Sequence, residues 1–122
     1  MKSCLVVDDS KVVRMVARKI LEGLNFQIVE AENGKLAMEE CAKQMPDAIL
    51  LDWNMPVLDG VEFVREIRGS GNKVPIVMIT SVTDSEKILQ AAAAGVNSYV
   101  EKPIRGPQLW DQIAMFFKHA GF

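Results

Sequence analysis

Short apolar segments alternate along the chain with longer segments in which apolar residues recur at helical spacing. The apolar segments span residues 4–7, 26–29, 48–51 and 74–79, and a fifth, more polar segment spans 97–100. Runs of this length, bounded by polar residues or glycine, predict β-strands. Each is followed by apolar residues three or four positions apart, which predicts an amphipathic helix. The pattern therefore predicts a strand–helix unit that occurs five times.

Residues typical of helix ends support this division. Ser10 and Asn33 precede two of the predicted helices, where their side chains can accept hydrogen bonds from the first turn. Residues 83–86 have the capping-box pattern, and Gly95 can end the helix that begins there. Pro107 suits the first turn of the last helix.

The third and fourth apolar segments have almost no polar side chains, so both of their faces are expected to be buried. Strands of this kind are typical of a parallel sheet covered by helices on both sides. We therefore predict an α/β fold with a doubly wound, five-stranded parallel sheet and five helices. The length of 122 residues suits a single domain over residues 1–122.

Composition narrows the classes of function. The 14 basic and 16 acidic residues give a net charge of −2, which argues against a broadly basic nucleic-acid binder. His119 is the single histidine, so a site with several histidine ligands is excluded. Cys4 and Cys41 are far apart and are predicted to be reduced, buried thiols. No segment is long and apolar enough for a membrane span or a signal-peptide core, which predicts a cytoplasmic protein without a membrane partner.

Polar residues that can carry chemistry follow four of the five predicted strands. Asp8 and Asp9 follow the first strand, Asp52 the third, Thr80 the fourth and Lys102 the fifth. Ligands of open α/β sheets bind outside the carboxyl ends of the strands. We therefore expect three carboxylates, a hydroxyl and an ammonium to meet at one edge of the sheet.

Three carboxylates held close together repel one another unless a cation offsets them. Oxygen ligands of this kind suit Mg²⁺, which commonly combines one or two carboxylates with water and a phosphate. Such a site can carry out phosphoryl transfer onto an aspartate. Asp52, at the end of the most apolar strand, is the predicted nucleophile, and Asp8 and Asp9 are predicted to hold the metal. Thr80 would donate a hydrogen bond and Lys102 a positive charge to the phosphoryl oxygens.

In this order and on these strands, the five residues resemble the receiver domain of bacterial two-component response regulators. The segment Asp52-Trp53-Asn54-Met55-Pro56, followed by Asp59-Gly60, is similar to that of the chemotaxis receivers of the family. The resemblance covers essentially the whole chain and implies a flavodoxin-like fold with strand order 2-1-3-4-5.

The resemblance also implies roles for individual residues. Asp52 would accept a phosphoryl group from a histidine kinase or a phosphotransfer protein. Asp9, Asp52 and the backbone carbonyl of Asn54 would coordinate Mg²⁺ directly, and Asp8 would act partly through water.

A switch residue is implied as well. Tyr99 would turn inward when Thr80 moves toward the phosphate, which changes a surface made of the fourth helix, the fifth strand and the last helix. The chain would then be a stand-alone regulator without an output domain that acts by binding another protein and is not a conventional enzyme. The target would be a flagellar motor switch protein, a kinase or a relay protein. The regulator would be a monomer or a phosphorylation-linked dimer.

For each of three further features, two interpretations remain open. Trp110 and Phe117 on the last helix belong either to a wide core stripe or to a hydrophobic partner face. Lys11, Arg14 and Arg18 on the first helix form either a solvated face or, by resemblance, a docking face for the phosphoryl donor. Trp53 is either a packing residue or an exposed residue near the metal.

Other functions remain as alternatives. A haloacid-dehalogenase-like phosphatase also uses an aspartate nucleophile and Mg²⁺, but there the nucleophile precedes the acidic pair, whereas Asp52 follows Asp8 and Asp9. A flavodoxin-like nucleotide binder would need backbone N–H groups for phosphate in the first loop, where the two aspartates would repel it. A binding module independent of phosphate would leave the acidic residues without a role.

Overall fold

The computed structural model describes residues 1–53, 60–80 and 85–117, in which strands and helices alternate as the hydrophobic pattern predicts. Along the chain the elements are β1 (Ser3–Val7), α1 (Lys11–Glu22), β2 (Gln27–Ala31), α2 (Gly34–Lys43), β3 (Ala48–Asp52), α3 (Gly60–Gly69), β4 (Ile76–Thr80), α4 (Ser85–Ala94), β5 (Ser98–Glu101) and α5 (Gly106–Phe117).

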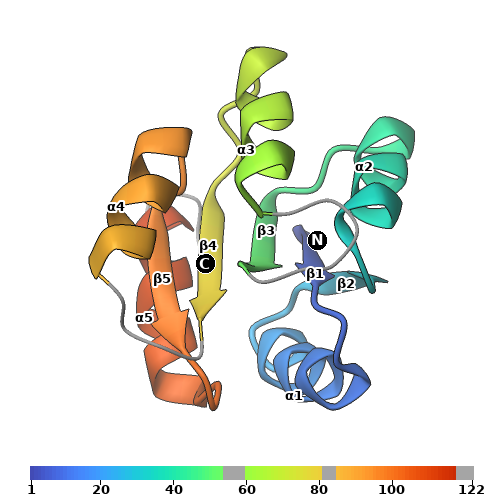
Figure 1. Cartoon of the computed structure of the whole chain (residues 1–122). Coiled ribbons are helices and arrows are strands. Elements are labelled where there is room, and N and C mark those ends of the chain that lie inside the picture. The colour runs from blue at the N-terminus through green and yellow to red at the C-terminus, as the bar shows by residue number, and fades with distance from the viewer. Residues whose placement is uncertain (54–59, 81–84, 118–122) are drawn as a thin grey trace.

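The five strands form one parallel sheet in the order β2-β1-β3-β4-β5 (Figure 1). This confirms the predicted α/β class and the flavodoxin-like order. In the register, Val7 of β1 pairs with Ala31 and with Leu51, Asp52 pairs with Ile79, and Thr80 pairs with Glu101. The carboxyl ends of β1, β3, β4 and β5 therefore lie next to one another at one edge of the sheet.

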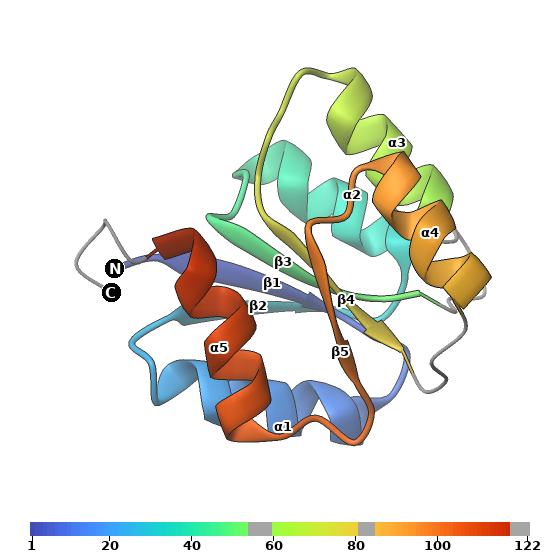
Figure 2. The same ribbon diagram turned by 90° about the vertical axis from the view of Figure 1, so that its left-hand side faces the viewer.

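Helices cover both faces of the sheet (Figure 2). Helices α1 and α5 lie on one face, and α2, α3 and α4 lie on the other. Alternate residues of each inner strand supply the two cores: Leu5 and Val7 face α2 and α3, whereas Cys4 and Val6 face α1 and α5. Every residue of β3 and β4 is buried. Since each large apolar side chain stabilises the fold by about 1.5–3 kcal/mol when buried, these two strands are a rigid support for whatever lies at their ends.

The predicted helix ends agree with the structure where it describes them. The Ser10 hydroxyl accepts from the Val13 N–H at 3.3 Å, and the Asn33 amide oxygen accepts from the Leu36 N–H at 2.8 Å. Gly95 has a φ of +119° and ends α4, since its N–H donates to the carbonyls of the last helical turn. Thr83 of the predicted capping box lies outside the described residues.

Four of the five strands run further toward their carboxyl ends than hydropathy predicts. Strand β2 ends at Ala31, and β3, β4 and β5 end at Asp52, Thr80 and Glu101. Their last residues are paired in the ladder even though three of them are polar. Asp52 and Thr80 are thus part of the sheet and are not loop residues that follow it.

Two further expectations can be compared with the structure. Both cysteines are buried and free, and burial raises the pKa of the Cys4 thiol to about 12, as expected for an unreactive core residue. Within the described residues, no helix has the length and hydrophobicity needed to cross a membrane.

Candidate functional site

Three carboxylates meet at the carboxyl edge of the sheet. Asp8 and Asp9 follow β1 directly, and Asp52 is the last residue of β3. One oxygen from each of the three lies within 4.8 Å of the other two. Asp8 and Asp52 are only 0% and 3% exposed, whereas Asp9 is exposed to solvent. The structure therefore brings together the three acids that the sequence predicts to share a site.

Lys102 reaches into this cluster from the end of β5. Its ammonium Nζ lies 3.3 Å from Asp8 Oδ2 and 3.6 Å from Asp52 Oδ1. The main chain of Lys102 is fixed by its N–H, which donates to the Thr80 carbonyl at 2.7 Å. One ammonium thus faces two buried carboxylates directly and a third close by, so the site is short of positive charge.

The environment of Asp8 shows this shortage most clearly. Burial raises the pKa of the Asp8 carboxyl above its usual value, and a hydrogen bond from the Ser10 N–H and the charge of Lys102 oppose the rise only in part. The Ser10 N–H donates to Asp8 Oδ1 at 2.8 Å. The other oxygen, Oδ2, is buried and accepts no hydrogen bond within the described parts of the chain.

A buried carboxylate oxygen without a hydrogen bond needs an explanation. Here the charged neighbour of Oδ2 is the Lys102 ammonium at 3.3 Å, and the Asp8 carboxylate shares the site with those of Asp9 and Asp52. Hard oxygen donors of this kind are the ligands that Mg²⁺ prefers. The donor set fits a divalent cation. The backbone carbonyl of Asn54, the further ligand that the family resemblance implies, lies outside the described residues.

Thr80 lies at the same edge and is buried at 2% exposure. It directly follows Ile79, which pairs with Asp52, and it pairs with Glu101, the residue before Lys102. The register therefore places the hydroxyl-bearing residue between the strand of the predicted nucleophile and the strand of the lysine. All five residues that the sequence assigns to the site end up at this one edge.

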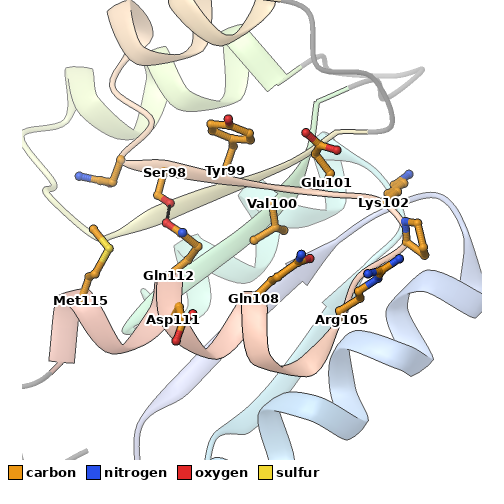
Figure 3. Close-up of a pocket in the computed structure, with 12 residues that line it drawn as sticks. Ser98, Tyr99, Val100, Glu101, Lys102, Arg105, Gln108, Asp111, Gln112 and Met115 are labelled. Carbon is orange, nitrogen blue, oxygen red and sulfur yellow. Dashed lines mark hydrogen bonds between the residues drawn. The ribbon is translucent and has the colours of Figure 1, made fainter.

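Strand β5 is much less covered than the inner strands. Tyr99 is 38% exposed and points away from α5 (Figure 3), beside a cavity of about 100 Å³ that Ile88 and Ala91 of α4 also line. A groove of about 680 Å³ is lined by residues of β5 and α5, and there Ser98 hydrogen bonds to Gln112. Tyr99 therefore has free volume next to it on the α4 side.

The two aromatic residues proposed as a partner face on α5 are separated by the structure. Trp110 is 52% exposed. Phe117 is 7% exposed, and its ring packs edge-on against Phe26 with the centroids 5.7 Å apart. Of the two interpretations left open for Phe117, the partner face is therefore wrong and the core stripe is right, because a 100° step per residue turns position 117 back to the core face shared by Leu109 and Ile113.

Trp53 and Gly60 form a contact that the sequence does not reveal. Trp53 follows Asp52, is 6% exposed and belongs to the core, which supports its interpretation as a packing residue. A Cβ on Gly60 would lie 2.5 Å from the Trp53 ring, so only glycine fits there. The sequence suggests only a turn or helix start at Gly60, because the close approach depends on how the Trp53 ring packs against the start of α3.

Arg14 and Arg18 are not a simple solvated face. Both pair with Glu30 of β2: Arg14 Nε lies 3.0 Å from Glu30 Oε1, and Arg18 Nε lies 2.8 Å from Oε2. Arg14 also donates from Nη1 to the backbone carbonyl of Asp8 at 2.7 Å. Lys11, the third basic residue of the set, is exposed. Sequence reasoning missed these contacts because Glu30 lies on a different element from the arginines.

Comparison with known proteins supports the same family as the sequence motifs. Residues 4–114 match the model of the response regulator receiver domain. The chemotaxis protein CheY of Halobacterium salinarum is 40% identical over 114 residues, which cover 93% of this chain and 94% of that protein.

Solved structures extend the likeness to three dimensions. The chemotaxis response regulator CheY4 of Vibrio cholerae superposes with a TM-score of 0.88 at 30% identity, covering 95% of this chain and 98% of that one. The receiver domain of a sensor histidine kinase from Pseudomonas aeruginosa PAO1 gives a TM-score of 0.87 at 30% identity, covering 96% and 98%. That structure contains a magnesium ion coordinated in its active-site cleft.

Proposed function

The chain belongs to the response regulator receiver domain family and is of the CheY type, and we propose that Asp52 accepts a phosphoryl group with Mg²⁺ bound beside it. One observation carries this proposal: two buried carboxylates and a third close by face a single ammonium at the carboxyl edge of the sheet. A cation and a phosphoryl group together would complete the charge balance of such a site.

Asp52 is the best nucleophile of the three acids. It ends a strand that is buried along its whole length, so its carboxylate is held on a rigid support. In the transfer, a carboxylate oxygen of Asp52 forms a bond to phosphorus while the bond from phosphorus to the donor atom breaks. The bonding electrons leave with the donor, which is a histidine nitrogen of a kinase or phosphotransfer protein, or the acetate oxygen of acetyl phosphate.

The neighbouring residues would support this step without being consumed. Asp8 and Asp9, with Asp52 and the carbonyl of Asn54, would hold Mg²⁺, which neutralises charge on the phosphoryl oxygens when it is bound. The Lys102 ammonium is already within 3.6 Å of Asp52 Oδ1 and would turn toward the incoming phosphoryl group. The Thr80 hydroxyl would donate a hydrogen bond to another of its oxygens.

Signal output would follow from a change around β5. When Thr80 shifts toward the phosphoryl group, Tyr99 would turn inward and change the surface of α4, β5 and α5. The cavity of about 100 Å³ beside Tyr99 supports this idea, since it leaves room for the ring. Phosphorylation would shift an equilibrium between two states according to the difference in their stabilisation.

We also propose that the receiver acts by itself, as a chemotaxis-type regulator. The similarity to CheY proteins over nearly the full length of both chains supports this assignment. The donor would be a histidine kinase or phosphotransfer protein, and the target a motor switch, kinase or relay protein. The alternatives of a phosphatase and of a nucleotide binder receive no support from the family match.

The test is phosphorylation by acetyl phosphate and Mg²⁺, followed by intact mass measurement. The wild type should gain one phosphoryl group, and Asp52→Asn should gain none. Asp47→Asn is a matched control, because Asp47 is an exposed aspartate at the other end of the same strand and should leave the gain unchanged. Equal gains in the wild type and in Asp52→Asn would contradict the proposal.

A further inference from the structure

The guanidinium of Arg14 joins the acidic site to Glu30 on the outer strand β2. Arg14 lies in the first turns of α1, and its Nη1 donates to the Asp8 carbonyl at 2.7 Å while its Nε donates to Glu30 Oε1 at 3.0 Å. Its side chain is only 14% exposed. A planar guanidinium can serve both acceptors at once, whereas an ammonium has no such fork.

These contacts complete the fixation of Asp8. Its N–H donates to the Ala31 carbonyl at 3.1 Å, its carbonyl accepts from Arg14, and its Oδ1 accepts from the Ser10 N–H. The carbonyl of Asp8 belongs to the peptide group that leads into Asp9. Because a peptide group is planar, holding this carbonyl also sets the direction in which Asp9 leaves the strand.

The carboxylate of Asp9 depends on the main chain for its position more than those of Asp8 and Asp52 do. Asp8 and Asp52 are buried and held by packing, whereas Asp9 is exposed. The position of its carboxylate is therefore set mainly by the main chain that carries it.

Glu30 in turn holds Arg14. Each of its carboxylate oxygens accepts from a different arginine, Oε1 from Arg14 and Oε2 from Arg18. Arg18 makes no contact with Asp8 in the described structure and bonds instead to Glu22 on its own helix. The two arginines share one carboxylate, but only Arg14 connects it to the acidic site.

We propose that Arg14 is a positioning residue for the metal site: held by Glu30, it fixes the Asp8–Asp9 peptide so that the two carboxylates converge on Mg²⁺. This inference rests on the proposed function, since it concerns the same cation. It assigns a role to a residue that touches neither the metal nor the phosphoryl group.

If only the charge of Arg14 mattered, its removal would change the Mg²⁺ affinity in the opposite direction. Removing a cation from the neighbourhood of the site reduces repulsion toward Mg²⁺ and should strengthen binding. Loss of positioning should weaken it. The direction of the change therefore separates the two effects.

The experiment is calorimetric titration of the metal-free full chain with Mg²⁺. Arg14→Gln should raise the Kd about 10-fold, the lower end of the effects typical for partners that orient metal ligands. Arg14→Lys should also weaken binding, although it keeps the charge. Arg18→Gln is the matched control: it makes the same charge change on the same helix, removes a Glu30 pair, and should leave the Kd within about twofold because the Asp8 carbonyl stays bonded.

A second measurement separates positioning from general damage. Because all metal ligands remain, the phosphorylation rate of Arg14→Gln with acetyl phosphate should recover to the wild-type value at saturating Mg²⁺. Circular dichroism checks that each variant is folded, and Arg14→Lys carries the comparison if Arg14→Gln is not.

The outcomes are distinguishable. Arg14 variants that bind Mg²⁺ as tightly as the wild type, or more tightly, would overturn the inference and leave the proposed function intact. A weakening of equal size in Arg18→Gln would also overturn it. A wild-type protein that binds no Mg²⁺ would overturn both the inference and the metal in the proposed function.

Discussion

Two acidic clusters lie on neighbouring strands of the sheet, and they differ in what neutralises them. On β2, the single carboxylate of Glu30 is paired with two guanidinium groups, at 3.0 and 2.8 Å. At the end of β1, the carboxylates of Asp8, Asp9 and Asp52 face one ammonium, that of Lys102. Counting Glu22, which pairs with Arg18, the first cluster has two cations for two carboxylates, whereas the second has one cation for three carboxylates.

The two clusters shift their acids in opposite directions. Burial alone would raise the pKa of Glu30, but the two arginines outweigh it and hold this pKa below the usual value. At Asp8, burial dominates and the pKa is raised. The Glu30 cluster is a finished structural ion pair, whereas the Asp8 cluster is incomplete, which is what a site for a cation and a phosphoryl group requires.

The comparison also shows why the net charge of the chain says little about function. A net charge of −2 hides the difference between the Glu30 cluster, whose charge is balanced, and the Asp8 cluster, whose charge is not. The two clusters are connected through Arg14, which bonds to Glu30 and to the Asp8 carbonyl. The Glu30 cluster therefore helps to hold the Asp8 cluster in position.

The largest effect is expected where Lys102, the cation that pairs with two carboxylates of the incomplete cluster, is removed. Removing one partner of a buried ion pair costs about 3–5 kcal/mol, and an exposed pair contributes about 0–1 kcal/mol. The Lys102 side chain is 25% exposed, so Lys102→Met should lower the free energy of unfolding by about 2 kcal/mol in metal-free protein at neutral pH. Urea unfolding measures this change.

Arg18→Met is the control for Lys102→Met, since it removes a cation from the finished cluster. Arg18 is 37% exposed and Arg14 remains on Glu30, so the loss should stay below about 1 kcal/mol. Saturating Mg²⁺ should reduce the effect of Lys102→Met and not that of Arg18→Met. Equal losses in the two variants would mean that the clusters do not differ in charge balance.

A smaller effect is expected in the dependence of stability on pH, with opposite signs for the two clusters. The Asp8 pKa is raised in the folded state, so between 3.8 and that pKa the folded protein holds more protons, and stability falls as pH rises. The Glu30 pKa is lowered, so its stabilisation is complete above 4.5 and is lost as pH falls through the folded pKa.

Two substitutions isolate these contributions in metal-free unfolding curves between about pH 3 and 8. Asp8→Asn should gain stability relative to the wild type as pH rises from 3.8. Glu30→Gln should lose stability relative to the wild type as pH rises toward 4.5. Parallel curves for Asp8→Asn and the wild type would show that Asp8 ionises at the same pH in the folded and unfolded chain.

Much of the fold and of the site follows from local sequence. Hydrophobic segments predict the five strand–helix units, and the parallel sheet brings the residues at the strand ends together, so Asp8, Asp52 and Lys102 can be placed at one edge without coordinates. The segment boundaries are less exact, because hydropathy stops at Asp52 and Thr80 although the ladder includes them.

What could not be predicted depends on contacts between elements. The Arg14–Glu30 pair joins α1 to β2, and Gly60 is required only because the Trp53 ring packs against it. For Phe117 the helical spacing left the core stripe and the partner face both open, and the edge-on contact with Phe26 decides for the core. No local pattern indicates which of these residues meet, so the sequence left their partners open.

The smallest effect is expected from a change beside the incomplete cluster that removes none of its charges. Tyr99→Leu removes no carboxylate and no cation, and Tyr99 points away from α5 toward a cavity lined by Ile88. If the cluster is governed by its own charges and by Arg14, this variant should change the Mg²⁺ Kd by less than about twofold, or about 0.4 kcal/mol. Asp9→Asn, which removes one charge of the cluster, should weaken binding much more. A change with Tyr99→Leu as large as that with Arg14→Gln would mean that β5 sets the metal affinity as well, and that the contrast between the two clusters is not a matter of local charge alone.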